Sequence, residues 1–188
     1  MTADTFFEKL ETLKAYRETR LQLAETVLKN PALLSELLRI CFLFNDPVSS
    51  RACWVLEFVC HKKLDWMIPF LDEFTAELKN FKLDSSKRPI AKICQLMIMA
   101  YFGKKPHIYK HKLEEIHLER IAESCFDWLI NDEKTAAKVY SIYTLFGLGK
   151  KYNWIYPELK LVLEKDIHKE SPGYKAAAKK ILANLPKD

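Results

Sequence analysis

Four times along this chain a helical stretch ends, a polar turn follows, and a second helical stretch opens with a basic residue near its start. The intervals between these basic residues are 37, 50 and 37 residues. The four residues are Arg51, Arg88, Lys138 and Lys175. A period of about 20 to 50 residues is typical of stacked repeats, in which each unit buries its apolar surface against its neighbours. The pattern therefore predicts a stack of helix pairs.

Apolar residues recur within these stretches at the spacing of one helix face. The last stretch shows this most clearly, with an apolar stripe made of Tyr174, Ala177, Ala178, Ile181, Leu182 and Leu185. Polar or proline-containing breaks, such as Asn45-Asp46-Pro47 and Ser171-Pro172-Gly173, divide the chain into about nine or ten helices. Only 4 of the 188 residues are glycine, and no stretch alternates apolar and polar residues. These observations predict an all-α protein.

The domain organisation that we predict is a single domain over residues 1–188. One or two helices within residues 4–30 cap the first repeat, and helix pairs fill residues 31–185. The long middle interval contains the extra segment from Gly103 to Lys112, which indicates a longer loop between repeats. The breaks also supply candidate helix caps, and we expect Asp46 and Asp132 to serve in this role.

The order of helix, turn with Asp, and second helix with an early basic residue resembles the HEAT-repeat pattern. The resemblance extends over about residues 31–185, and the Asn45-Asp46 and Asn131-Asp132 turns carry it best. It implies an armadillo-like α-solenoid, a right-handed α-α superhelix of about four helix pairs. By the same resemblance, the second helices line the concave surface. These helices begin near Val48, Lys87, Thr135 and Tyr174.

Basic and aromatic side chains share faces of these second helices. Arg51 and Trp54 lie on one face of their helix, opposite its apolar stripe, and Arg88 shares a face with Lys92. The candidate binding residues are Arg51, Trp54, Arg88, Lys92, Lys138 and Lys175. HEAT-like alkylpurine DNA glycosylases use a basic and aromatic concave surface, so the resemblance leaves a nucleic-acid-binding module open.

Catalytic and metal-binding signatures give little support to an enzyme. His107, His111 and His117 follow a proline and lie among lysines, with no HExxH motif, so we expect no metal and no other cofactor. The GxSxG motif is absent. The fumarase and adenylosuccinate lyase superfamily requires a Gly-Ser-Ser loop followed by Met-Pro, and Ser49-Ser50 and Ser85-Ser86 lack both flanks.

The N-terminus carries acidic residues without a long apolar run, and no stretch reaches the roughly 18 apolar residues of a membrane span, so we expect a cytoplasmic protein without a membrane partner, and a monomer. The five cysteines stand singly in apolar stretches, which predicts free, buried thiols, and they are Cys41, Cys53, Cys60, Cys94 and Cys125. The formal net charge of +5 falls short of the excess typical of dedicated nucleic-acid-binding domains.

One further helix carries acids at four-residue steps, which predicts a solvated acidic stripe of Glu115, Glu119, Glu123 and Asp127. We expect this stripe to repel a phosphate backbone passing nearby.

The sequence therefore favours a non-enzymatic scaffold that binds a protein or peptide on its concave surface. A nucleic-acid-binding module is the main alternative, and a lyase without a recognisable active site is a third.

Overall fold

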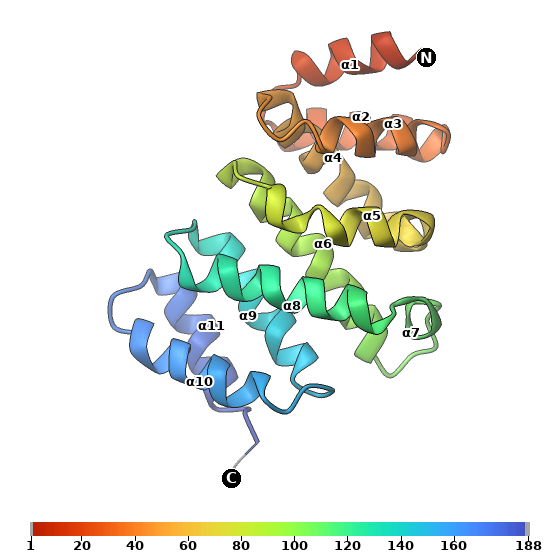
Figure 1. Cartoon of the computed structure of the whole chain (residues 1–188). Helices are drawn as coiled ribbons and strands as arrows, with labels where there is room; N and C mark the ends of the chain where they lie inside the picture. Colours follow the sequence, from red (N-terminus) through yellow and green to blue (C-terminus); the bar gives the residue numbers. More distant parts are fainter. Residues whose placement is uncertain (1, 187–188) are drawn as a thin grey trace.

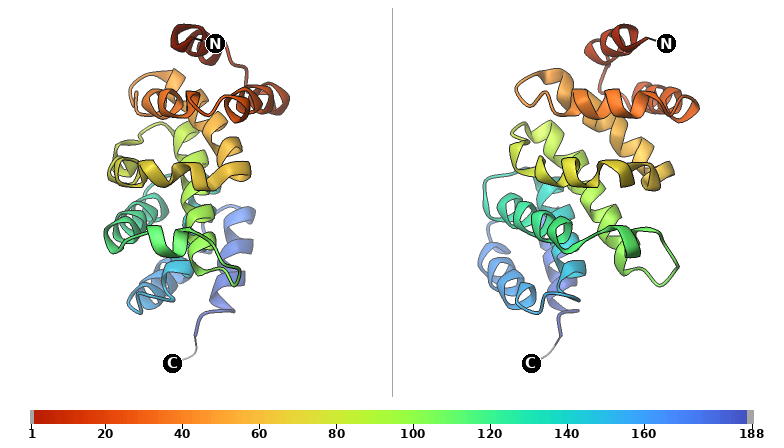
Figure 2. Two further views of the ribbon diagram at one scale, coloured as in Figure 1. Left: turned by 90° about the vertical axis from the view of Figure 1, so that its right-hand side faces the viewer. Right: turned by 45° about the vertical axis from the view of Figure 1, so that its right-hand side comes forward.

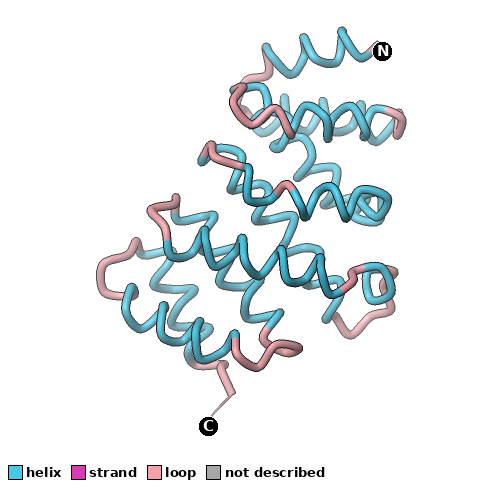
Figure 3. The backbone as a smooth tube through the Cα atoms, in the orientation of Figure 1, coloured by secondary structure: helices cyan, strands magenta, loops and turns pink. Residues whose placement is uncertain are grey.

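The computed structural model describes residues 2–186, which form helices and connecting turns with no strand among them (Figure 3). The α-helices are α1 (Ala3–Glu11), α2 (Arg17–Lys29), α3 (Leu33–Cys41), α4 (Pro47–Lys63), α5 (Leu71–Ala76), α6 (Asp84–Phe102), α7 (Tyr109–Lys112), α8 (Glu115–Ile130), α9 (Thr135–Leu148), α10 (Ile155–Asp166) and α11 (Pro172–Leu182). Two 3₁₀ segments, Leu64–Phe70 and Leu78–Asn80, flank α5. The all-α solenoid predicted from the sequence is confirmed.

The helices form two rows that run from the N-terminus to the C-terminus of the stack (Figures 1 and 2). The inner row contains α2, α4, α6, α9 and α11, and the outer row contains α3, α5, α8 and α10. Successive helices pack closely along the inner row, whereas contacts between successive outer helices are sparse. The row with the closer packing lies on the inside of the curve, so the inner row lines the concave side of the stack.

Two helices, α1 and α2, form the N-terminal region. Helix α2 is the first member of the inner row and packs on α4. Helix α1 lies above the stack, against α3 and α4, and buries Phe6 and Leu10 completely (Figure 1).

The extra segment between the inner helices α6 and α9 is held in place by a buried tyrosine. Residues 103–108 form a loop, and the short helix α7 follows. The Tyr109 side chain is fully buried, and its hydroxyl donates a hydrogen bond of 2.8 Å to the carbonyl of Leu64. Burial raises the pKa of this hydroxyl. The insertion therefore packs against the preceding repeat and lengthens the middle interval.

The predicted repeat register needs a correction of one residue. The inner helices begin at Pro47, Asp84, Thr135 and Pro172. By this register Lys138 is the fourth residue of α9, and its equivalent in α6 is Lys87 rather than Arg88. Two matching ion pairs follow from the corrected register. Lys87 binds Glu133, and Lys138 binds Glu170, each acid lying two residues before the next inner helix.

One of the two predicted aspartate caps is correct. Asp46 caps α4, since its Oδ1 accepts a hydrogen bond of 2.8 Å from the backbone N–H of Val48. Asp132 is exposed, and the N-cap position of α9 is held by Lys134, directly before the first helical residue Thr135. The prediction of an Asp132 cap is therefore wrong. The aspartate lies two residues before the N-cap position, too early in the loop to reach the first free N–H groups.

Candidate functional site: the inner surface

Charge is segregated between the two rows of helices. The inner helices α2, α4, α6, α9 and α11 together carry 13 Lys or Arg residues and four acidic residues. The outer helices α3, α5, α8 and α10 carry four Lys or Arg residues and ten acidic residues. The concave side is therefore a basic surface and the convex side an acidic one, although the net charge of the chain is small.

Cations lie over aromatic rings along the inner row, and each pair joins elements of neighbouring repeats. We call the side chains of these pairs, together with the neighbouring Arg88, the inner surface. Its members are Arg17, Arg20, Trp54, Phe58, Arg88, Lys92, Phe102, Tyr140, Tyr143, Lys150 and Lys180. The cation–π contacts measure 4.9 to 6.0 Å from the charged group to the ring centroid. Contacts at this distance stabilise the stack and hold cations at a solvent-facing surface.

The upper part of the inner surface centres on Trp54. The Arg20 guanidinium lies 5.3 Å from the Trp54 ring and 5.9 Å from the Phe58 ring. The indole Nε1 donates a hydrogen bond of 2.8 Å to the carbonyl of Ser85, at the start of α6. Trp54 is thus half-buried and held between two repeats, with Arg20 over its ring. Burial lowers the pKa of Arg20, and repulsion from Arg88 lowers it further.

The middle part contains one buried carboxylate among several cations. Glu57 is 6% exposed and accepts a hydrogen bond of 3.3 Å from the Arg88 guanidinium. Lys92 donates to the Gln95 side chain at 2.8 Å and lies 4.9 Å from the Tyr140 ring. Burial lowers the pKa of Lys92, Glu57 opposes this shift, and Arg88 adds to it. The positive charge here exceeds what the single carboxylate of Glu57 neutralises.

The lower part is a pocket of about 430 Å³ between α6, α9 and α11. Its floor is apolar and includes Met99, whose side chain is 60% exposed. Lys150 lies over Phe102 and Lys180 over Tyr143 at the rim. We call this hollow the Met99 pocket.

Three of the six candidate residues proposed from the sequence belong to the inner surface, namely Trp54, Arg88 and Lys92, whereas Arg51 is not a member of it. Arg51 and Trp54 lie one turn apart on α4, both half-buried, and Arg88 and Lys92 lie one turn apart on the neighbouring helix α6. Lys138 lies elsewhere, because its side chain is 7% exposed and its ammonium is 2.6 Å from Glu170. This ion pair joins two repeats, so the Lys138 ammonium is not available to bind a ligand.

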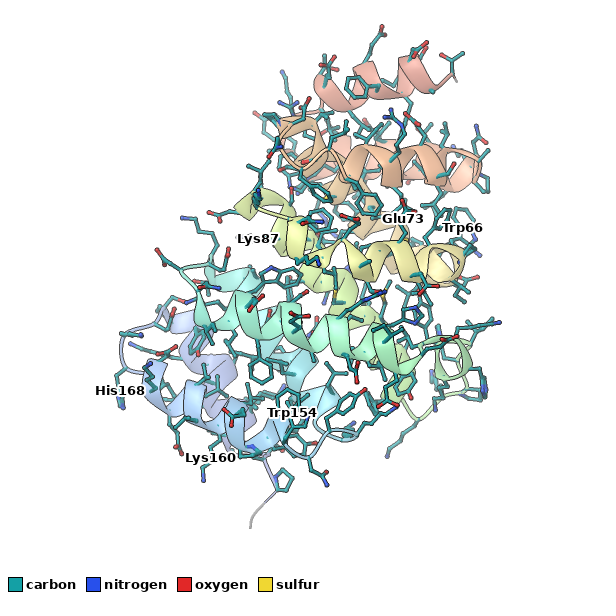
Figure 4. The ribbon with its side chains drawn as sticks, in the orientation of Figure 1. Trp66, Glu73, Lys87, Trp154, Lys160 and His168 are labelled. Carbon is teal, nitrogen blue, oxygen red and sulfur yellow. The ribbon has the colours of Figure 1, made fainter. Side chains whose placement is uncertain are left out.

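Lys175 also lies outside the inner surface. It is the fourth residue of α11, the register position at which Lys87 and Lys138 turn toward the following repeat. Figure 4 marks Lys87 at the beginning of α6, near the loop that precedes α9. The position of Lys175 therefore directs it toward the C-terminal end of the stack rather than toward the other cations.

Several members of the inner surface were not predicted from the sequence. Arg17 and Arg20 fall in the region assigned to capping helices, and Lys150 follows a glycine after α9. A signal was present, because Tyr143 and Lys180 occupy the register position of Lys92 in their own helices. Counting charges separately for first and second helices would also have shown the segregation.

The serine pairs and His117 have structural roles. Ser50 and Ser86 lie with their hydroxyls 2.8 Å apart, and Ser85 donates to Ser50 at 2.7 Å, which joins α4 to α6. His117 is buried, accepts from the N–H of Glu114 at the start of α8, and lies 2.8 Å from Asp72 on α5. Within residues 2–186, no group of three His, Cys, Asp or Glu residues has a metal-binding arrangement.

The acidic stripe on α8 lies on the opposite side from the inner surface. All four of its residues are exposed, and Glu115 is 3.6 Å from Lys151. Trp154, also 55% exposed, stacks on Phe126 on this outer side (Figure 4). The expectation that the stripe repels a phosphate backbone at the binding surface is therefore not supported by its position.

Comparison with known proteins places this architecture in a family. A family model described as a HEAT repeat domain matches residues 8–185. The chain belongs to the HEAT repeat family. No curated protein and no solved structure matches it. Among the described residues of this HEAT-repeat chain, no helix is both long enough and apolar enough to span a bilayer.

Proposed function

We propose that this HEAT-repeat protein is a non-catalytic scaffold that binds an acidic segment of a partner protein on its inner surface. The segregation of charge between the two rows of helices carries this proposal. A segment rich in Asp and Glu complements the exposed cations and is repelled by the acidic outer row. The curved row of helices offers an extended surface for such a segment.

The aromatic side chains favour a polypeptide over a nucleic acid. Single-stranded nucleic acids gain affinity by stacking bases on exposed aromatic faces. Here Arg20 lies over Trp54, Lys92 over Tyr140, and the Trp54 indole is also tied to the repeat below. A base would have to displace these cations, whereas a carboxylate can bind them where they lie.

The roles of the polar side chains support a binding role rather than catalysis. The serines considered for a lyase loop join α4 to α6, because Ser50 forms hydrogen bonds with Ser85 and Ser86. His117 caps the start of α8 and contacts Asp72. These groups hold helices together, and none lies in the Met99 pocket.

A binding assay with two probes tests the proposal. We expect a fluorescein-labelled acidic peptide to bind at physiological salt, and an oligonucleotide of about 20 nucleotides to bind much more weakly. Arg20→Glu and Lys180→Glu should each raise the Kd for the peptide about tenfold, equivalent to about 1.4 kcal/mol. Lys160→Glu, on the outer helix α10, is the matched control because it changes the net charge equally.

Two results would contradict the proposal. One is tight, steeply salt-dependent binding of the oligonucleotide, which would favour the nucleic-acid-binding alternative. The other is an equal loss of peptide affinity in Lys160→Glu and Lys180→Glu, which would show that net charge alone attracts the peptide.

A further inference from the structure

The Met99 pocket has an apolar floor that a close helix crossing creates. A Cβ added to Gly147 of α9 would lie 2.7 Å from Cγ2 of Ile98 on α6, so the missing side chain lets the two helices approach. Met99 and Phe102 continue the α6 side of the floor, and Phe146 continues the α9 side. The volume of about 430 Å³ is within the range of ligand-binding pockets and exceeds that of one side chain.

The rim of the pocket is basic. Lys150 and Lys180 are both exposed and line the pocket from two different elements, and Gln95 adds a neutral amide. No Asp or Glu of residues 2–186 lines it. An occupant with apolar groups at its centre and carboxylates at its edges is complementary to this arrangement.

The apolar floor of the pocket favours a helical occupant. An extended peptide would bring unpaired N–H and C=O groups onto the apolar floor, where Met99 and Phe102 supply no partner for them. A helix satisfies its own backbone and presents side chains at positions i and i+4 to a hydrophobic groove. The pliable Met99 side chain can adjust to the shapes of such residues.

We propose that the Met99 pocket takes two large apolar side chains, one turn apart, from an acidic amphipathic helix of the partner protein. This inference rests on the proposed function and names the feature of the partner that gives specificity. The carboxylates that flank the apolar pair on that helix bind Lys150 and Lys180. The pocket is open to the solvent along the inner surface, as a helix-binding site requires.

The test uses the full chain and two labelled peptides of about 16 residues, long enough for partial helicity. One contains glutamate and alanine with leucines at positions i and i+4, and the other has alanines in place of these leucines. We expect the leucine peptide to bind at least tenfold more tightly than the alanine peptide. Met99→Glu should abolish this difference, and Met99→Leu should preserve it. Circular dichroism melts check that both variants fold.

The possible outcomes separate this inference from the proposed function. Equal affinities of the two peptides, both weakened by Arg20→Glu, would overturn the pocket proposal and leave the acidic-segment proposal standing. Failure of both peptides to bind at concentrations up to about 1 mM, a free energy of about −4 kcal/mol, would overturn both. A leucine preference that survives Met99→Glu, or a pocket that takes dodecanoate and rejects both peptides, would also overturn the pocket proposal.

Discussion

Lysines on the inner helices have different roles, which their neighbours decide. Lys138 lies in a nearly buried ion pair with Glu170, whereas Lys180 is exposed over the ring of Tyr143. Both are basic residues on inner helices, and the sequence pattern alone does not separate them. The pairing of Lys138 depends on a contact 32 residues away, which local periodicity does not encode.

The first prediction concerns the lysine that joins two repeats. Lys138→Met should lower the free energy of unfolding by about 2 to 3 kcal/mol, because it leaves the shielded carboxylate of Glu170 without its charged partner. Lys175→Met, at the equivalent position of α11, should change it by less than about 0.5 kcal/mol. Urea denaturation measures both, and equal effects would contradict the assigned role of Lys138.

The cysteines give a second prediction at the residue scale. All five thiols are buried and free of disulfides, as the sequence predicted. Burial raises the pKa of Cys125 to about 12, so its reactive thiolate is scarce at neutral pH. A thiol reagent should therefore react slowly with the native protein and titrate five thiols in denaturant without a reducing agent. Fewer than five thiols after unfolding would contradict the structure.

The sequence predicted individual helices better than it predicted contacts between repeats. The apolar stripe that begins at Tyr174 predicted α11, where Tyr174, Ala178 and Ile181 are buried. The periodicity identified the helices because burial on one face forces a pattern into the sequence. The sequence placed the start of α9 near the observed Thr135, and the one-residue error lay in α6, where Lys87 and Arg88 are adjacent and the sequence pattern selected Arg88.

The two loop aspartates give a prediction for the helix termini. Asp46→Ala should lower the free energy of unfolding by about 0.5 to 2 kcal/mol, because it removes the hydrogen bond to the N–H of Val48. Asp132→Ala should have an effect within about 0.5 kcal/mol, since this exposed residue caps no helix. Thermal melts of the two variants make the comparison. An equal loss in both would show that the sequence-based assignment of two caps was correct.

At the scale of the whole molecule, the two rows of helices separate opposite charges onto opposite sides. The sequence predicted a concave basic surface through the family resemblance, and Arg88 and Lys92 are part of it. It did not predict the Met99 pocket, which forms where Gly147 of α9 crosses Ile98 of α6. Such a pocket depends on the angle between helices from different repeats, and residue spacing within one helix carries no information about it.

The helices that a bound acidic peptide protects decide whether the ligand lies on the basic or the acidic side of the stack. Amide hydrogen exchange of the full chain, measured with and without the saturating acidic leucine peptide, reports which helices become protected. We predict added protection in α6, α9 and α11, which surround the Met99 pocket, and none in the outer helices α8 and α10. Protection confined to α8 and α10 would place the ligand on the acidic side and contradict binding at the inner surface.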